Sequence, residues 1–258
     1  MKFLPAACLL MSLWAGTPQA GGSQRELDYA DYLRQTVVMG QGIWLGEGGQ
    51  SFFALLTEAE KSDHGRAVLL LHDMGEHPDQ QPVMHGLRVV LPQHNWTTLS
   101  IQLPVREAGA GRADYYGLFD EAHGRIQTAV GYLRKIGAKD IAVVGHGMGA
   151  AMAAYSLSLD PNGLAALALV SLAVPDSSLP QAQTGQFIKN IALPILDLYA
   201  EFDLSEVVDT ARRRRMLGKD NPVYRQVRIN GENHAFAQDP NLLIKRIYSW
   251  LALSLGPN

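Results

Sequence analysis

The sequence predicts one α/β domain built on a doubly wound, mostly parallel sheet with helices on both faces. Strand-like and helix-like segments alternate along most of the chain, which is the pattern of such folds. Several strand segments are apolar at nearly every position, for example RAVLLL at 66–71 and IAVV at 141–144, as expected of parallel strands buried on both faces. The 258 residues, 47% of them hydrophobic, supply enough material for one large core.

Each element follows from periodicity and from its flanking turns. Residues 23–42 are polar and mixed, and they predict an arm or a short helix. The predicted strands cover 51–59, 66–71, 96–104, 140–144, 164–175, 193–203 and 224–230. The predicted helices cover 83–94, 113–137, 148–155, 205–217 and 241–255. Only about 17 residues connect the strand ending in LAVP to the strand starting with LPILDLYA, so no large lid domain is expected there.

The amino-terminal segment has the layout of a secretory signal peptide. Lys2 precedes the apolar run FLPAACLLMSLWAG, and small residues follow. We predict a cleaved signal over 1–20, an arm over 21–48 and a single domain over 49–258. A retained membrane anchor is the alternative. The single cysteine, Cys8, lies in the signal, so the mature chain has no disulfide or thiolate site and suits the periplasm.

Three loops carry the residues on which function depends. The first is the turn GHGMG at 145–149, the second follows LDLYA and contains Asp203, and the third is NGENHAF with His234. The order turn, acid, histidine resembles the α/β-hydrolase fold, whose members have Ser, then Asp or Glu, then His, with the serine in G-x-S-x-G. Gly147 stands at the serine position here.

The resemblance covers about residues 50 to 255 and extends to finer motifs. The chain is most similar to a family of exported proteobacterial proteins with an LHDMGEHPD turn at 71–79 and a WTTLSIQLP strand at 96–104. That resemblance brings no biochemical role with it. It implies that Asp203 is the acid and His234 the base, with Glu201 as a less favoured acid. A buried polar pair that only holds two loops together is the alternative interpretation of Asp203 and His234.

The resemblance also implies which residues line the site. His72, Asp73 and Met74 form the turn that supplies an oxyanion-hole amide, while His146 and Met148 flank the elbow. Asp73 departs from the family pattern, which has glycine there. Its carboxylate either faces the hole and opposes the charge of an oxyanion or turns away and caps a neighbouring turn.

The sequence predicts no metal and no cofactor. His72, Asp73, His146 and His234 are the residues that a metal would need, but their spacing matches no metal motif. The run Arg212 to Arg215 is typical of a solvated stretch of helix, with an anionic partner as the alternative. The net charge of −3 argues against a nucleic-acid partner.

Three functions remain open from the sequence. The favoured one is a pseudo-hydrolase that binds a small acyl, ester-like or lipid ligand, or an envelope partner, without turnover. The second is a carboxylic-ester hydrolase that uses Asp203 and His234 with water, or with Ser171 or Ser205. The third is a structural protein of the cell envelope. Loss of the nucleophile costs on the order of a million-fold in turnover, which places the first ahead of the second.

Overall fold

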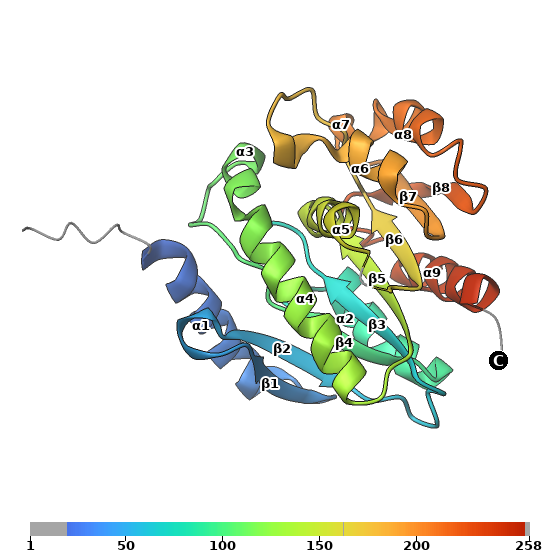
Figure 1. Ribbon diagram of the computed structural model, residues 1–258. Helices are drawn as coiled ribbons and strands as arrows, with labels where there is room; N and C mark the ends of the chain where they lie inside the picture. Colours follow the sequence, from blue (N-terminus) through green and yellow to red (C-terminus); the bar gives the residue numbers. More distant parts are fainter. Residues whose placement is uncertain (1–19, 162, 256–258) are drawn as a thin grey trace, which may run out of the picture.

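A computed structural model describes residues 20–161 and 163–255 of the chain (Figure 1). The predicted signal peptide, apart from Ala20, and any cleavage site before that residue lie outside the described residues. Within these ranges, the helices are all too short or too polar to cross a membrane.

The eight-stranded sheet has the spatial order β1-β2-β4-β3-β5-β6-β7-β8. All strands from β4 to β8 in this order are parallel, whereas β2 runs antiparallel to both of its neighbours. The predicted fold class is therefore confirmed. The strands are β1 (Gln41–Leu45), β2 (Phe52–Thr57), β3 (Arg66–Leu71), β4 (Thr97–Ile101), β5 (Asp140–His146), β6 (Ala166–Val170), β7 (Ile195–Phe202) and β8 (Tyr224–Asn233).

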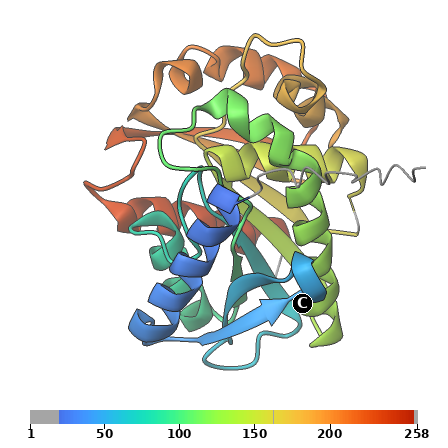
Figure 2. The same ribbon diagram turned by 90° about the vertical axis from the view of Figure 1, so that its left-hand side faces the viewer.

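Helices cover both faces of the sheet, as the views in Figures 1 and 2 show. The first face carries α4 (Phe119–Lys135), α5 (Met148–Leu159) and α6 (Thr184–Asn190). The opposite face carries α1 (Ala20–Thr36), α2 (Val83–Val90) and α9 (Pro240–Leu255). The remaining described helices are short: α3 (Arg112–Tyr115), α7 (Ser205–Val208), α8 (Ala211–Leu217), and 3-10 turns at Gly48–Gln50, Leu91–His94, Tyr116–Leu118 and Pro180–Ala182.

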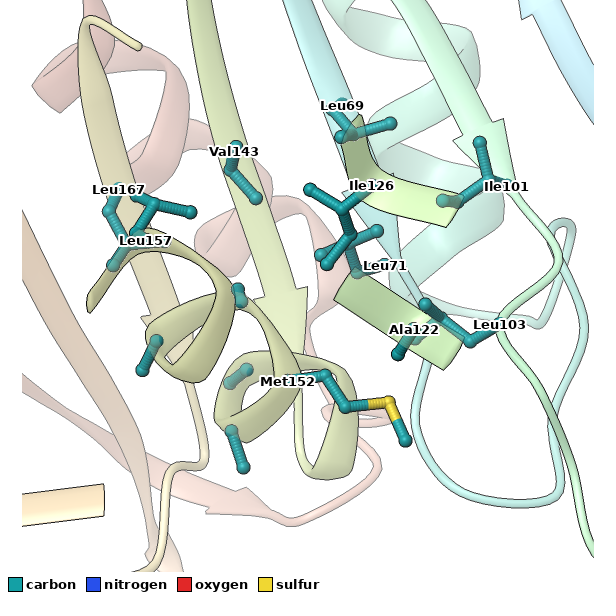
Figure 3. Close-up of a cluster of buried hydrophobic side chains, with 14 of the residues drawn as sticks. Leu69, Leu71, Ile101, Leu103, Ala122, Ile126, Val143, Met152, Leu157 and Leu167 are labelled. Carbon is teal, nitrogen blue, oxygen red and sulfur yellow. The ribbon is translucent and has the colours of Figure 1, made fainter. Parts of the chain in front are cut away.

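Strand β3 shows how the two hydrophobic cores arise. Leu69 and Leu71 point toward α4 and α5, where they pack with Ile126 and Met152 (Figure 3). Leu70, between them, packs into the second core against the other layer of helices. Side chains alternate along a strand, so a strand between two layers must be apolar at every position. This rigid centre fixes the loops at the ends of the strands.

Residues 21–48, predicted as an arm, contribute directly to the sheet. β1 pairs with β2 along its whole length, with Gln41 opposite Leu56 at one end and Leu45 opposite Phe52 at the other. α1 places Ala30 and Leu33 against Phe53 and Leu55 of β2. The short strand QGIWL has glycines on both sides and lies at the edge of the sheet, so its periodicity is too brief to predict it.

The arginine run also differs from the prediction at one position. Arg214 in α8 is fully buried, and its Nε donates a 2.8 Å hydrogen bond to Asp197. Tyr224 and Gln226 donate to the same carboxylate oxygen. One side of α8 faces the core, so the run is not a uniformly solvated stretch.

The connection between β6 and β7 is short, as predicted. All of its residues are described, and they form only the 3-10 turn Pro180–Ala182, α6 and the loops around them, so no lid domain is inserted there. The carboxyl ends of the parallel strands therefore meet at an edge bordered by loops, which is where ligands bind in this kind of sheet.

Candidate active site

Loops that follow β3, β5, β6, β7 and β8 converge at the carboxyl edge of the sheet. At or just after the ends of these strands lie, in chain order, His72, Gly147, Ser171, Asp203 and His234. Neighbouring parallel strands end at the same edge, so residues far apart in sequence come together there.

The elbow after β5 has the backbone of a strained nucleophile turn. Gly147 has φ 53° and ψ −114°, a conformation that side-chain-bearing residues rarely adopt. α5 begins at Met148. A Cβ on Gly149 would lie 2.3 Å from the carbonyl oxygen of His72, so the first turn of α5 packs directly on the end of β3. Both glycines are thus required by the backbone geometry.

Asp203 and His234 form the acid–imidazole pair that the resemblance implied. The Nδ1 of His234 donates to Asp203 Oδ1 over 2.7 Å, and the Asp203 side chain is fully buried. Asp203 also accepts hydrogen bonds from the Ser171 hydroxyl and the Ala200 amide. Glu201 instead accepts from the Gly231 amide, away from the imidazole. Asp203 is therefore the acid partner, and Nε2 of His234 faces the elbow.

Asp73 faces the elbow rather than turning away. Its Oδ1 accepts hydrogen bonds from the Met74 amide at 2.7 Å and the Met148 amide at 2.5 Å. Its Oδ2 lies 2.9 Å from His234 Nε2. A Cβ added to Gly147 would lie only 2.1–2.3 Å from the three carboxylate atoms of Asp73. The carboxylate therefore fills the space next to the elbow.

The two amides have a defined role in serine hydrolases of this fold. The oxyanion hole there consists of the amide after the nucleophile and an amide from the loop after the third strand. Met148 and Met74 hold those positions here. Both amides already donate to Asp73, so no donor of this pair is free for a substrate oxyanion.

The charges of the site support this arrangement. Burial alone would lower the pKa of His234, but its hydrogen bonds to Asp203 and Asp73 and their negative charges raise that pKa to about 9. Burial opposes ionisation of Asp73, but the His234 hydrogen bond and the Met148 amide outweigh it, and the pKa of this carboxyl falls well below its usual range. At neutral pH, His234 is an imidazolium held between two carboxylates.

His72 supports the turn from behind. Its Nδ1 donates to the backbone carbonyl of Asp73 over 2.7 Å, so Nε2 is the acceptor for the Leu103 amide at 2.9 Å. Complete burial lowers the pKa of His72 to about 3, which keeps the ring neutral. His72 thus ties the turn to the chain after β4 and does not point into the site.

His146 lies beneath His234. The two ring centroids are 4.9 Å apart, and Nε2 of His146 donates to the backbone carbonyl of His234 over 3.0 Å. A carbonyl only accepts, so Nε2 carries the proton and Nδ1 has a free lone pair. This Nδ1 is buried without a hydrogen-bond partner among the described residues, and burial lowers the pKa of the ring.

Neither of the two serines proposed as substitute nucleophiles hydrogen-bonds to His234 within the described part of the chain. Ser171 has a positive φ of 54° and donates its hydroxyl to Asp203 Oδ2 at 2.5 Å. It thus contacts the acid and not His234 Nε2. Ser205 is the first residue of α7.

Glu76 is a site residue that the sequence analysis missed. Its carboxylate accepts a 3.1 Å hydrogen bond from the Asp73 amide. Burial and the neighbouring Asp73 charge raise the pKa of Glu76 to about 7. It lies within the LHDMGEHPD turn, but nothing in the spacing separates it from the other polar residues there.

A potential metal-binding group is also present. Asp73, His146 and His234 each offer one ligand atom, and these atoms lie within 4.8 Å of one another. His72, the fourth residue that a metal would need, is not part of the group, and both of its nitrogens hydrogen-bond to the backbone.

Comparison with known proteins identifies the family of the chain. The sequence matches a family of proteins of unknown function, DUF3530, over residues 17–115 and 119–253. The chain belongs to this DUF3530 family. No curated protein matches the sequence.

Solved structures share the fold at low sequence identity. Est1E from Butyrivibrio proteoclasticus superposes with a TM-score of 0.67 at 14% identity, covering 84% of this chain and 99% of its own. Dienelactone hydrolase from Anabaena variabilis gives 0.66 at 17% identity, with 84% and 98% covered. The Pyrococcus furiosus esterase Pf2001 gives 0.69 at 15% identity, with 87% and 96% covered. These likenesses establish the α/β-hydrolase fold of this DUF3530 protein.

Proposed function

We propose that this DUF3530 protein is an exported, non-catalytic member of the α/β-hydrolase fold that binds its target without turnover. One observation carries the proposal. The Asp73 carboxylate takes the space beside Gly147 where a nucleophile would stand, and it accepts the hydrogen bonds of both oxyanion-hole amides. An acyl-transfer transition state needs that space and those donors.

The base is also unavailable. A general base must accept a proton at its operating pH. Nε2 of His234 is bonded to Asp73, and the raised pKa of His234 keeps the ring protonated at neutral pH. A hydrolase that uses His234 to activate water is therefore less well supported, and so is one that uses Ser171, whose hydroxyl contacts Asp203.

The position of the Asp73 carboxylate limits which kinds of ligand the protein can bind. An ester carbonyl cannot enter a hole that Asp73 occupies, so we place the binding surface on the rim. Phe202 and Leu204 flank Asp203 and are 68% and 39% exposed. Exposed apolar side chains beside a site favour an apolar target. We therefore favour an acyl or lipid chain over an ester-like ligand bound in the hole. A purely structural role in the envelope remains the alternative.

Chemical labelling tests the absence of catalysis. We expect no fluorophosphonate adduct, no adduct from an epoxide probe and no turnover of short activated esters. Peptide mass spectrometry after each probe provides the measurement. The Asp73→Gly, Gly147→Ser double variant is the matched positive control, because it empties the hole and supplies a serine. A stoichiometric adduct on Ser171, Ser205 or Asp73 of the unaltered protein would overturn the proposal.

Two further measurements test export and the apolar target. We expect protein from the periplasmic fraction to begin near residue 21, which amino-terminal sequencing checks; an intact Met1 in the cytoplasm would contradict export.

We expect native mass spectrometry to show acyl-chain adducts that decrease in a Phe202→Ser variant. Adducts unchanged by that substitution would move the binding surface away from Asp203.

A further inference from the structure

We propose that Asp73, His146 and His234 form a binding site for a divalent first-row transition metal ion such as Zn²⁺. The ligand atoms of this trio lie within 4.8 Å of one another. Two imidazoles and one carboxylate are a donor set that such ions favour. This inference goes beyond the proposed function and does not depend on it.

The first supporting observation is the hydrogen bonding of the two histidines. A histidine that binds a metal normally donates its other ring N–H to a carboxylate or carbonyl, which fixes the tautomer. His234 donates Nδ1–H to Asp203, and His146 donates Nε2–H to the backbone carbonyl of His234. Both rings are thus held by outer partners of the expected kinds.

The second observation is the unused lone pair of His146. Its Nδ1 is buried, has no hydrogen-bond partner within the described part of the chain and cannot carry the proton that Nε2 donates. Most buried polar atoms have a partner, and a bound ion is one explanation of an exception. A metal ion shared with Asp73 and His234 would satisfy this nitrogen.

The charges balance when the ion binds. Asp73 and Asp203 carry one negative charge each, and the proton on Nε2 of His234 leaves to solvent as the metal takes its place. Two carboxylates then face one divalent cation. Asp73 turns its Oδ2 from the imidazole to the ion, and Oδ1 keeps its bonds to the Met74 and Met148 amides.

The site also has an open side. Three protein ligands leave at least one position of a tetrahedral ion for water or another small ligand. The side chains of His234 and Asp73 are 22% and 10% exposed, so this position faces the solvent edge of the sheet. The open position distinguishes the site from a closed structural zinc site.

Titration of chelator-treated mature protein with Co²⁺ and Zn²⁺ at about pH 8 tests the proposal. We expect one equivalent of Co²⁺ to give visible absorption bands of a nitrogen- and oxygen-coordinated ion and Zn²⁺ to displace it. The decisive variant is His146→Gln, because the glutamine amide can keep the donation to the His234 carbonyl but has no Nδ1 lone pair. We expect this variant and Asp73→Asn to bind Zn²⁺ at least about 100-fold more weakly. Asp203→Asn, which alters only an outer partner, should lose about 10–100-fold.

His94→Gln is the matched control, because His94 lies on an exposed turn and stacks on Tyr248. We expect it to bind metal like the unaltered protein. Circular dichroism and thermal melting in the presence of chelator identify any variant that fails to fold. If His146→Gln does not fold, the Zn²⁺ affinity of Asp203→Asn decides the test. No stoichiometric Co²⁺ spectrum, or the same affinity in His146→Gln as in His94→Gln, would overturn the proposal.

Discussion

The carboxylate of Asp73 occupies the space that a side chain on residue 147 would need. Its Cγ, Oδ1 and Oδ2 lie 2.1–2.3 Å from the position of a Cβ on Gly147. The glycine at 147 and the aspartate at 73 are therefore structurally linked. A chain with Asp73 in this position has room only for glycine at 147, and a serine there would require a smaller residue at 73.

This relationship predicts strong coupling between the two positions. Gly147→Ser alone should lower the free energy of unfolding by about 2–5 kcal/mol, because it adds a side chain at positive φ and collides with Asp73. In the Asp73→Gly background, the same change should cost only the backbone strain of about 1–3 kcal/mol. Urea unfolding of the four proteins of the cycle measures the difference. Strictly additive effects would mean that Asp73 does not fill this space.

The same pair predicts activity. The Asp73→Gly, Gly147→Ser variant frees the Met74 and Met148 amides and places a hydroxyl near His234, so we expect weak hydrolysis of short activated esters. Gly147→Ser alone should stay inactive, because Asp73 still holds the amides. Adding His234→Ala to the active variant should abolish the gain. Activity that survives this third change would show that His234 is not the base.

The raised pKa of His234 predicts loss of stability in alkali. The folded pKa of about 9 lies above the ordinary value of 6.5, so the stabilisation is complete below about pH 6.5 and is lost as pH rises through 9. Its size is on the order of 3 kcal/mol. Urea unfolding across this range, with chelator present, provides the measurement, and His234→Gln should flatten the curve. A flat curve for the unaltered protein would contradict an imidazolium between two carboxylates.

Much of the fold could be predicted from sequence because it depends on local patterns. The apolar strands, the alternation with helices and the glycines of the elbow are visible within short windows. The order of Asp203 and His234 along the chain also indicated which loops would meet. The strand QGIWL escaped prediction because its five residues have no clear periodicity.

The orientation of the Asp73 side chain in the site could not be predicted from local patterns. The orientation of Asp73 is set by the Met148 amide and by His234, which are 75 and 161 residues away in sequence. Local preference would allow this side chain to cap its own turn, and it does accept the Met74 amide. Only the packing of three loops brings the same carboxylate within hydrogen-bond distance of the Met148 amide and of His234.

Glu76 should destabilise the folded protein when it ionises, whereas a carboxylate with a lowered pKa stabilises it. Its pKa of about 7 lies above the ordinary 4.5, so ionisation of the folded protein is unfavourable and stability is lost as pH rises from about 4.5 through 7. Glu76→Gln keeps an acceptor for the Asp73 amide but removes the charge. We expect this variant to be more stable by about 1–3 kcal/mol at alkaline pH and to show no gain in acid, as measured by urea unfolding. Equal stability of the two proteins at every pH would rule out the buried charge.

Helix α1 holds the turn that carries Asp73, although it comes from the segment predicted as an arm. The Arg25 guanidinium donates to the Gly75 carbonyl at 2.7 Å and to the Arg106 carbonyl at 3.0 Å. The Tyr29 hydroxyl donates to the same Gly75 carbonyl at 2.6 Å. The turn after β3 is thus held by α1 through the Gly75 carbonyl.

These contacts predict that α1 controls the mobility of the turn. Arg25→Met with Tyr29→Phe should lower the free energy of unfolding by about 2–4 kcal/mol, because the two hydrogen bonds from the Arg25 guanidinium to backbone carbonyls and the one from the Tyr29 hydroxyl are lost. Hydrogen exchange should speed up at the Met74 and Met148 amides, which depend on Asp73 staying in place. Gln24→Ala is the matched control: Gln24 bonds Asp28 on the exposed side of α1, and its loss should change stability by less than about 0.5 kcal/mol. Unchanged exchange at both amides in the double variant would show that the elbow alone holds the Asp73 carboxylate in place.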